Sequence, residues 1–124
     1  IIIGCFDDTA LDEAAAISDC PVVGIGQASY HYAALRKKRF SVVTTLSVSV
    51  PIIEDNIRGM GLTKFVSKVR ASEVPVLELE TDPKKASELI KLEALRAQNL
   101  DEVSAIILGC ANRSNWMAEC MYCP

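Results

Sequence analysis

The sequence predicts an α/β domain with a largely parallel sheet, on the strength of three observations. Its 124 residues fall within the usual size of one domain, and half of them are hydrophobic, which is enough to bury a core. Short aliphatic runs rich in β-branched residues alternate with helix-like segments along the chain. An order in which strands and helices follow one another singly is typical of sheets whose strands run parallel.

Five runs have the composition of strands that are buried on both faces. They span residues 1–4, 21–25, 40–45, 65–69 and 103–108. Because ligands bind beyond the carboxyl ends of parallel strands, we expect a site where these runs end.

Four helices are predicted between these strands, over residues 9–18, 27–38, 51–60 and 83–98. Asp12 and Glu13 lie in the first turn of the first helix, where the helix dipole favours negative charge. Pro51 suits a first helical position, and Gly61 follows that helix as a candidate C-cap. Asp82 is the expected N-cap of the last helix.

The last predicted helix carries a broad apolar face. Its members are Ala86, Leu89, Ile90, Leu95 and Ala97. Residues 71–81, which precede this helix, are long for a connection, and long connections are typical of segments that shape a pocket.

Composition and charge exclude several classes of protein. With 23% charged residues, 6 Gly and 5 Pro, the chain is neither disordered nor collagen-like. A net charge of −3 gives no field that attracts nucleic acid or an anionic membrane surface. No apolar run is long enough to span a bilayer and no leader is visible, so we expect a cytoplasmic protein. The chain starts without Met inside an aliphatic run, which predicts a fragment of a longer protein.

The cysteines indicate a reducing compartment. They are Cys5, Cys20, Cys110, Cys120 and Cys123, an odd number without the dense spacing of a disulfide framework. The Cys120-x-x-Cys123 spacing fits half of a zinc site or a redox pair, but His31 is the one histidine available as a further ligand. We therefore predict free thiols and no metal, with Cys20 as a small packing residue.

The most informative feature is an internal echo, a short sequence pattern that occurs twice. Three bulky aliphatic residues, a glycine and a cysteine end the first strand at Cys5 and the last at Cys110. A glycine before the cysteine allows close backbone approach, and a following helix N-terminus favours the thiolate. Two such thiols across a pocket could remove a proton from a carbon acid and return one to its opposite face. Two alternatives stay open: a chance repeat, or a single Cys–His pair with His31 as the base.

Five motifs in register resemble the hydantoin and allantoin racemases of the aspartate/glutamate racemase superfamily. They are Gly4-Cys5-Phe6-Asp7-Asp8-Thr9, Pro21-Val22-Val23-Gly24-Ile25-Gly26, Phe40-Ser41-Val42-Val43-Thr44-Thr45-Leu46, Val50-Pro51-Ile52-Ile53-Glu54-Asp55 and Leu108-Gly109-Cys110-Ala111. The resemblance implies three-layer, parallel-sheet lobes of the Asp/Glu racemase type with a small-molecule substrate between them. Residues 1–39 would be an incomplete first lobe, and residues 40–124 a largely present second lobe.

The resemblance also implies roles for particular residues. Cys5 and Cys110 become the acid/base pair of a racemase that needs no cofactor and acts on 5-substituted hydantoins or allantoin. Thr44 and Thr45 would bind the carbonyl or ring N–H groups of the substrate. The backbone at three further positions would hold the enolate oxygen, namely Phe6, Ala111 and Asn112.

Departures from the family pattern limit these implications. The upstream substrate-binding segment of the first lobe is absent, and Asn112-Arg113 stand where relatives usually have Gly-Met. We therefore expect weak or no activity from the 124 residues alone. An incomplete lobe exposes apolar surface, which is compatible with a homo-oligomer.

Other interpretations compete with the proposed racemase. An Asp/Glu racemase or a maleate isomerase relative would use similar cysteine chemistry, and a catalytically inactive fragment would retain the fold alone. The glycines of Gly24-Ile25-Gly26 nearly satisfy a dinucleotide pattern, but the next strand ends in Thr44-Thr45 where a ribose-binding acidic residue is needed. In the racemase interpretation, the two glycines turn the chain tightly near the pocket. The basic run of residues 36–39 is interpreted as a solvated helix end rather than a nucleic-acid patch.

Overall fold

A computed structural model describes residues 1–36 and 38–110 of the chain. The strands in this part are β1 (Ile2–Ile3), β2 (Val23–Gly24), β3 (Phe40–Thr44), β4 (Val66–Ala71) and β5 (Ala105–Gly109). The helices are α1 (Leu11–Ile17), α2 (Ile25–Leu35), α3 (Ser49–Gly59), α4 (Glu78–Thr81) and α5 (Pro83–Leu100). The predicted alternation is confirmed. The short helix α4 is an addition, and it forms within the long connection.

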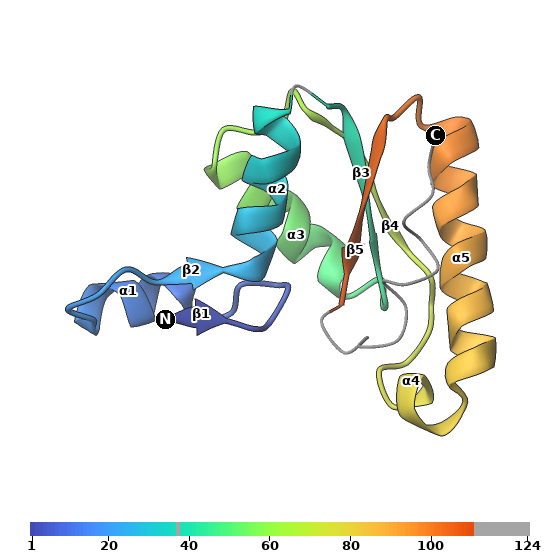
Figure 1. Cartoon of the computed structure of the whole chain (residues 1–124), viewed down its shortest axis with the longest axis horizontal. Coiled ribbons are helices and arrows are strands. Elements are labelled where there is room, and N and C mark those ends of the chain that lie inside the picture. Colours follow the sequence, from blue (N-terminus) through green and yellow to red (C-terminus); the bar gives the residue numbers. More distant parts are fainter. Residues whose placement is uncertain (37, 111–124) are drawn as a thin grey trace.

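The strands form two parallel sheets. One has three strands in the order β4-β3-β5, and the other pairs β1 with β2. Figure 1 shows α2 and α3 on one side of the three-stranded sheet and α5 on the other. This three-layer arrangement confirms the predicted fold class.

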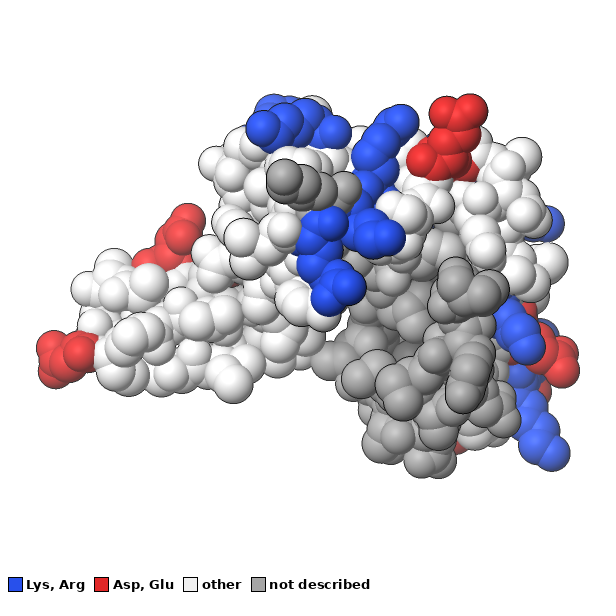
Figure 2. Space-filling model, turned by 45° about the horizontal axis from the view of Figure 1, so that its top comes forward, with Lys and Arg blue, Asp and Glu red and all other residues white. Residues whose placement is uncertain are grey.

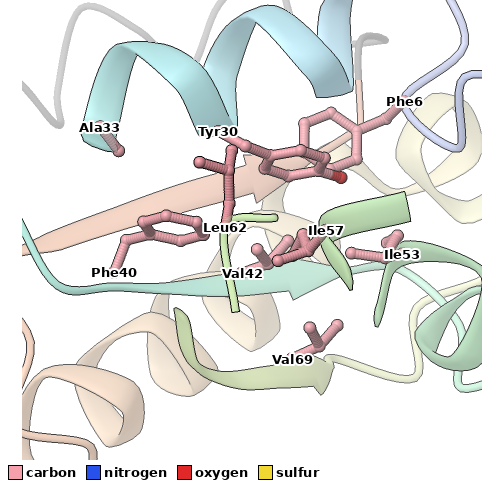
Figure 3. Close-up of a cluster of buried hydrophobic side chains, with 9 residues drawn as sticks. All are labelled: Phe6, Tyr30, Ala33, Phe40, Val42, Ile53, Ile57, Leu62 and Val69. Carbon is pink, nitrogen blue, oxygen red and sulfur yellow. The ribbon is translucent and has the colours of Figure 1, made fainter. Parts of the chain in front are cut away.

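The first core cluster lies between the three-stranded sheet and helices α2 and α3 (Figure 3). All five residues of the central strand β3 are buried, because helices cover both of its faces. Three aromatic rings extend the cluster along α2: Tyr30 stacks on Phe40 at 6.1 Å between ring centroids, and Phe6 meets Tyr30 edge-on at 5.6 Å.

The second core cluster lies under α5, and its apolar stripe is narrower than the sequence predicts. Ala86, Ile90 and Ala97 are buried against the sheet. Leu89 and Leu95 were expected on the same face, but they are exposed. Residue 93, which completes the stripe at helical spacing, is a glutamate that pairs with Arg70 of β4. The inward face of α5 is thus partly ionic.

The β1–β2 pair contradicts the expectation of a buried first strand. Ile2 is 76% exposed and Val23 40% exposed, although the two residues are partners in the parallel pair. Cys20, just before β2, is also exposed instead of packed, with its Sγ 3.3 Å from Ser18 Oγ. Burial of these residues needs neighbouring strands and helices, and two strands alone cover too little.

The predicted helix ends are confirmed at two places. The Asp82 carboxylate accepts a hydrogen bond from Lys85 N at 3.2 Å and so caps α5. Gly61 has a φ of +71° and follows α3 as the left-handed residue of a Schellman motif, in which Leu62 N donates to Ile57 O at 3.0 Å.

The described part of the basic run, Arg36, Lys38 and Arg39, is exposed where α2 leads into β3. Basic side chains gather on this rim of the molecule (Figure 2). Among the described residues, no helix has the length and hydropathy to cross a membrane.

Candidate active site

The first predicted cysteine stands at the start of a tight turn. Asp8 N donates to Cys5 O at 3.0 Å, which closes residues Cys5–Asp8 into one turn directly after β1. We call these four residues the cysteine turn. The thiol of Cys5 is exposed, with its Sγ 3.7 Å from Thr9 Oγ1. Cys5 is therefore open to a ligand, whereas the three residues after it are each fixed by a different element.

Phe6 fixes the cysteine turn to the end of β5. Its side chain is buried, and a methyl group added at Gly109 would lie only 3.1 Å from Cδ1 of Phe6 and 3.3 Å from Cα of Thr44. Glycine at position 109 thus allows a close approach that a larger residue would crowd, as the sequence predicts for the residue before a site cysteine. At Gly4, which precedes Cys5, an added methyl group would meet nothing within 4 Å. The expectation of close approach is therefore wrong for the first copy of the echo.

Asp7 fixes the cysteine turn to α3. Ser49 Oγ, in the first residue of α3, donates to Asp7 Oδ2 at 2.9 Å. Asn56 Nδ2, two turns further along the same helix, donates to the Asp7 carbonyl oxygen at 2.8 Å. The turn that presents Cys5 is therefore attached to the helix that covers the three-stranded sheet.

Asp8 fixes the cysteine turn to α2. Its carboxylate accepts hydrogen bonds from Gly26 N at 3.0 Å and from Gln27 N at 2.6 Å, so it closes the N-terminus of α2. Burial raises the pKa of the Asp8 carboxyl above its usual value, and this outweighs the lowering by the two backbone donors.

The two glycines near this carboxylate are explained by close packing and not by the predicted tight turn. Gly24 and Gly26 were expected to turn the chain tightly, yet neither has a positive φ. A methyl group at Gly24 would overlap the Asp8 carboxylate, and one at Gly26 would overlap Phe6 O. Both glycines make room for the cysteine turn. The same contact disfavours a nucleotide here, because a carboxylate already occupies the amides that would hold a phosphate.

Thr44 and Thr45 are both buried at the end of β3, and they differ in their contacts. The Thr44 hydroxyl donates to Gly109 O at 3.4 Å, next to the ring of Phe6. The carbonyl oxygen of Thr45 accepts a hydrogen bond from Val74 N at 3.1 Å. Thr44 therefore joins Phe6 and Gly109 at the point where the cysteine turn meets β5, and substrate contacts of either threonine stay a prediction.

The second predicted cysteine, Cys110, follows directly after β5. It is half-buried and packs against the second core cluster, on the opposite face of the sheet from Phe6. Within residues 1–36 and 38–110, no hydrogen bond joins its sulfur to that of Cys5. The predicted enolate-binding residues Ala111 and Asn112 lie outside the described residues, as do Cys120 and Cys123.

His31 lies away from these groups, on the exposed side of α2. Its Nδ1–H donates to Gln27 O at 2.8 Å, one turn earlier in the helix. No contact in the described part of the chain joins it to a cysteine. In the same part, no group of three or more His, Cys, Asp or Glu residues could hold a metal ion.

An acidic pocket of about 320 Å³ adjoins the cysteine turn at Asp8. Its lining includes Asp8, Asp12, Glu13 and Asp55, whereas Cys5, Thr44 and Cys110 do not line it. None of residues 71–81 lines it either, so this pocket does not test the expectation that the long connection shapes one.

Sequence reasoning missed the anchors of the cysteine turn. The side chains of Asp7 and Asp8 were not predicted to bind the helices, and Ser49 and Asn56 were not singled out. One signal was available: a carboxylate near a helix N-terminus is stabilised by the helix dipole, so acidic residues after a strand end are candidates for such a contact. Their partners are 18 to 49 residues away in the chain, so only the fold reveals them.

A sequence model of the Asp/Glu/hydantoin racemase family matches residues 1–121. The hydantoin racemase of Rhizobium meliloti is 46% identical over 92% of this chain and 47% of its own length. That of Pseudomonas sp. (strain NS671) is 36% identical over 93% of this chain and 46% of its own.

Two solved structures share the fold. Allantoin racemase from Klebsiella pneumoniae has a TM-score of 0.83 at 34% identity, covering 89% of this chain and 45% of its own. Allantoin racemase from Pseudomonas fluorescens has a TM-score of 0.83 at 37% identity, covering 89% and 47%. This chain thus spans about half the length of these proteins. Since the family match runs through nearly all of its residues, the chain belongs to the Asp/Glu/hydantoin racemase family.

Proposed function

We propose that the protein, when complete, is a cofactor-independent racemase of hydantoin-type cyclic ureides such as 5-substituted hydantoins or allantoin. The relatives named hydantoin racemase and allantoin racemase support this substrate class. Residues 1–39 would belong to one lobe and residues 40–124 to the other, with the substrate between them.

The contact between Phe6 and Gly109 carries the proposal. Phe6 directly follows Cys5, and Gly109 directly precedes Cys110, so this contact brings two strand ends of different sheets to one place. The echo in the sequence and the contact in the fold are independent observations. Together they favour a shared site over a chance repeat.

The proposed reaction uses each cysteine once per turnover. The thiolate of one cysteine removes the proton from the stereogenic carbon, and the electron pair moves onto the adjacent carbonyl oxygen to give an enolate. The thiol of the other delivers a proton to the opposite face, and the electron pair returns to carbon. Backbone N–H groups near Phe6, Ala111 and Asn112 would stabilise the enolate oxygen, and Thr44 and Thr45 would orient the ring.

The roles of the thiols would interchange for the opposite enantiomer. A complete cycle leaves one thiol and one thiolate, as at the start, so no oxidant or cofactor is consumed. Both groups have to be free, which is consistent with the reducing compartment that the cysteine pattern predicts.

The test is exchange of the C5 hydrogen for deuterium. Enantiopure 5-benzylhydantoin and allantoin are incubated in heavy water with the chain and with its Cys5→Ser and Cys110→Ser variants. We expect exchange and loss of optical rotation above the buffer rate, abolished by either substitution. Cys20→Ser is the matched control, because Cys20 is an exposed thiol that the proposal does not use.

If the chain shows no deuterium exchange, a second experiment is needed, because the chain spans about half the length of its relatives. Fusing to it the uncovered parts of the Rhizobium meliloti relative supplies the remaining structure. Exchange by this fusion, lost with Cys5→Ser, would support the proposal. Exchange on aspartate or glutamate but on no ureide would replace the proposed substrate class.

A further inference from the structure

The Asp8 carboxylate joins two parts of the molecule that the sequence separates by 18 residues. It comes from the cysteine turn, yet both of its hydrogen-bond partners are amides of the first turn of α2. The cap position of α2 itself is Gly24, which has no side chain to close the helix. Asp8 therefore supplies the cap from outside the helix.

The surroundings of Asp8 are adapted to this contact in two ways. Gly24 and Gly26 leave the space that its carboxylate fills, since a methyl group at either position would overlap it. Asp8 itself has a φ of +52°, a left-handed conformation that residues with side chains rarely adopt. A cap that served α2 alone would need neither feature, because a serine or aspartate at position 24 would do.

We propose that Asp8 is a positioning residue for the thiol of Cys5: by closing the N-terminus of α2 it holds the cysteine turn, and with it Cys5, in one orientation at the end of β1. This inference rests on the proposed function, because positioning Cys5 affects catalysis only if Cys5 is one of the two acid/base residues. The hydrogen bond from Asp8 N to Cys5 O carries the constraint from the carboxylate to the cysteine.

The first test measures alkylation of each thiol by iodoacetamide, resolved by peptide mass spectrometry. Cys20, which is exposed, is the reference, and the half-buried Cys110 reports on opening of the core. Asp8→Asn keeps the shape of the side chain but one of its two acceptor atoms becomes a donor. We expect the Cys5-to-Cys20 rate ratio to rise about fivefold, the factor that corresponds to losing one helix cap, with the Cys110-to-Cys20 ratio unchanged.

Two matched controls separate positioning from loss of stability. Asp82→Ala removes the N-cap of α5, far along the chain from Cys5, and leaves both ratios unchanged. Gly24→Ala obstructs the Asp8 carboxylate without altering Asp8 and reproduces the rise at Cys5. Gly59→Ala is its control, because an added methyl group there meets nothing within 4 Å.

Several outcomes would overturn the inference. One is an unchanged Cys5 ratio in folded Asp8→Asn and Gly24→Ala. Another is an equal rise at Cys5 and Cys110, which would indicate general loosening. Additive effects of Asp8→Ala and Gly24→Ala in the double variant would also count against it, since residues that share one contact are non-additive.

The second test uses whichever form of the chain exchanges deuterium. Misplacement of a reacting group lowers kcat about 100-fold while KM stays within about threefold, so this split is expected for Asp8→Asn. If the active form keeps its kcat in Asp8→Asn, the positioning role is overturned and the proposed function is not affected. If neither the chain nor the fusion exchanges a ureide while the reactivity of Cys5 still responds to Asp8→Asn, the proposed function is overturned and the positioning role stays in place.

Discussion

The two Gly-Cys strand ends share a sequence pattern but are held in place by different physics. The end of β1 is part of an exposed two-stranded pair, and its cysteine turn is fixed mainly by hydrogen bonds that Asp7 and Asp8 accept from helices α3 and α2. The end of β5 lies in a sheet covered on both faces, where Gly109 is fixed by close packing. A short sequence repeat thus predicts a common position on a sheet edge, and it does not predict a common means of support.

The difference has a simple origin in the number of neighbours. β3 pairs with a strand on each side and has a helix layer on each face, so strand pairing and packing together determine where β5 ends. Among residues 1–36 and 38–110, β1 pairs only with β2, so its end depends on polar contacts with elements further along the chain. Four variants or pairs of variants test this comparison.

Arg70→Ala should have the largest effect. It acts on the three-stranded sheet, which helices cover on both faces and which we call the covered region. Arg70 donates two hydrogen bonds to Asp101, from Nε at 2.7 Å and from Nη2 at 2.5 Å. It donates a third, from Nη1, to Glu93 at 3.0 Å. The side chains of all three are largely buried, so removing the cation leaves the Asp101 carboxylate without its ion pair, while Glu93 keeps a pair with the more exposed Arg96. We expect a loss of about 3 to 5 kcal/mol in the free energy of unfolding, measured by urea denaturation.

Arg58→Ala is the control for this variant. Its ion pair with Asp55 is also 2.5 Å long, but both side chains are more than two-thirds exposed. The expected loss is within about 0.5 kcal/mol. Equal losses from the two variants would show that burial of the ion pair is not what stabilises the covered region.

Gly109→Ala and Gly4→Ala compare the two strand ends directly. The methyl group at position 109 meets Phe6 and the Thr44 backbone at 3.1 to 3.3 Å, and we expect a loss of about 1 to 3 kcal/mol. At position 4 the methyl group meets nothing, and the change should stay within about 0.5 kcal/mol. Thermal unfolding of both variants decides the matter, and a larger loss at Gly4 would contradict the comparison.

Asp101 and Asp8 should give opposite dependences of stability on pH. The hydrogen bonds from Arg70 hold the pKa of Asp101 below its ordinary 3.8, so its stabilisation is present above that value and is lost as the pH falls through the lowered pKa. Burial raises the pKa of Asp8 above 3.8. Its contribution is therefore fully present below 3.8 and is lost as the pH rises through the raised pKa.

The measurement is the urea midpoint from about pH 3 to about pH 7 for the two asparagine variants. Asp101→Asn should flatten the acid limb of the wild-type profile, whereas Asp8→Asn should flatten the decline that follows at higher pH. Flattening of the same limb by both variants would show that the two carboxylates do not differ in this way.

The sequence predicted the fold well where it depends on local pattern. The aliphatic runs and caps located β3, β5 and the ends of α3 and α5, because alternation, Asp82 and Gly61 act over a few residues. Burial of residues 1–3 was predicted wrongly, since an aliphatic run shows what a strand can bury and not which neighbours are present.

The candidate site was predictable only in part, for a similar reason. The repeated Gly-Cys ending pointed to two strand ends that the fold brings together through Phe6 and Gly109. The support of Cys5 was not predictable, because Asp8 acts on amides far along the chain. Gly24 and Gly26 illustrate this best: their spacing resembled a nucleotide motif or a tight turn, and the actual reason is a carboxylate from another segment.

Tyr30→Phe should have the smallest effect. Tyr30 lies between Phe6 of the cysteine turn and Phe40 of the three-stranded sheet. Tyr30 is fully buried between Phe6 and Phe40, and its hydroxyl has no hydrogen-bond partner among the described residues. Burial, and then the charges of Asp8 and Asp7, raise the pKa of this hydroxyl, so it stays neutral. Removing an unpaired buried hydroxyl while keeping the ring should leave stability unchanged or increase it by up to about 1 kcal/mol. A clear loss of stability in urea denaturation would mean that the hydroxyl has a partner, and the junction between the cysteine turn and the covered sheet would then be polar as well as packed.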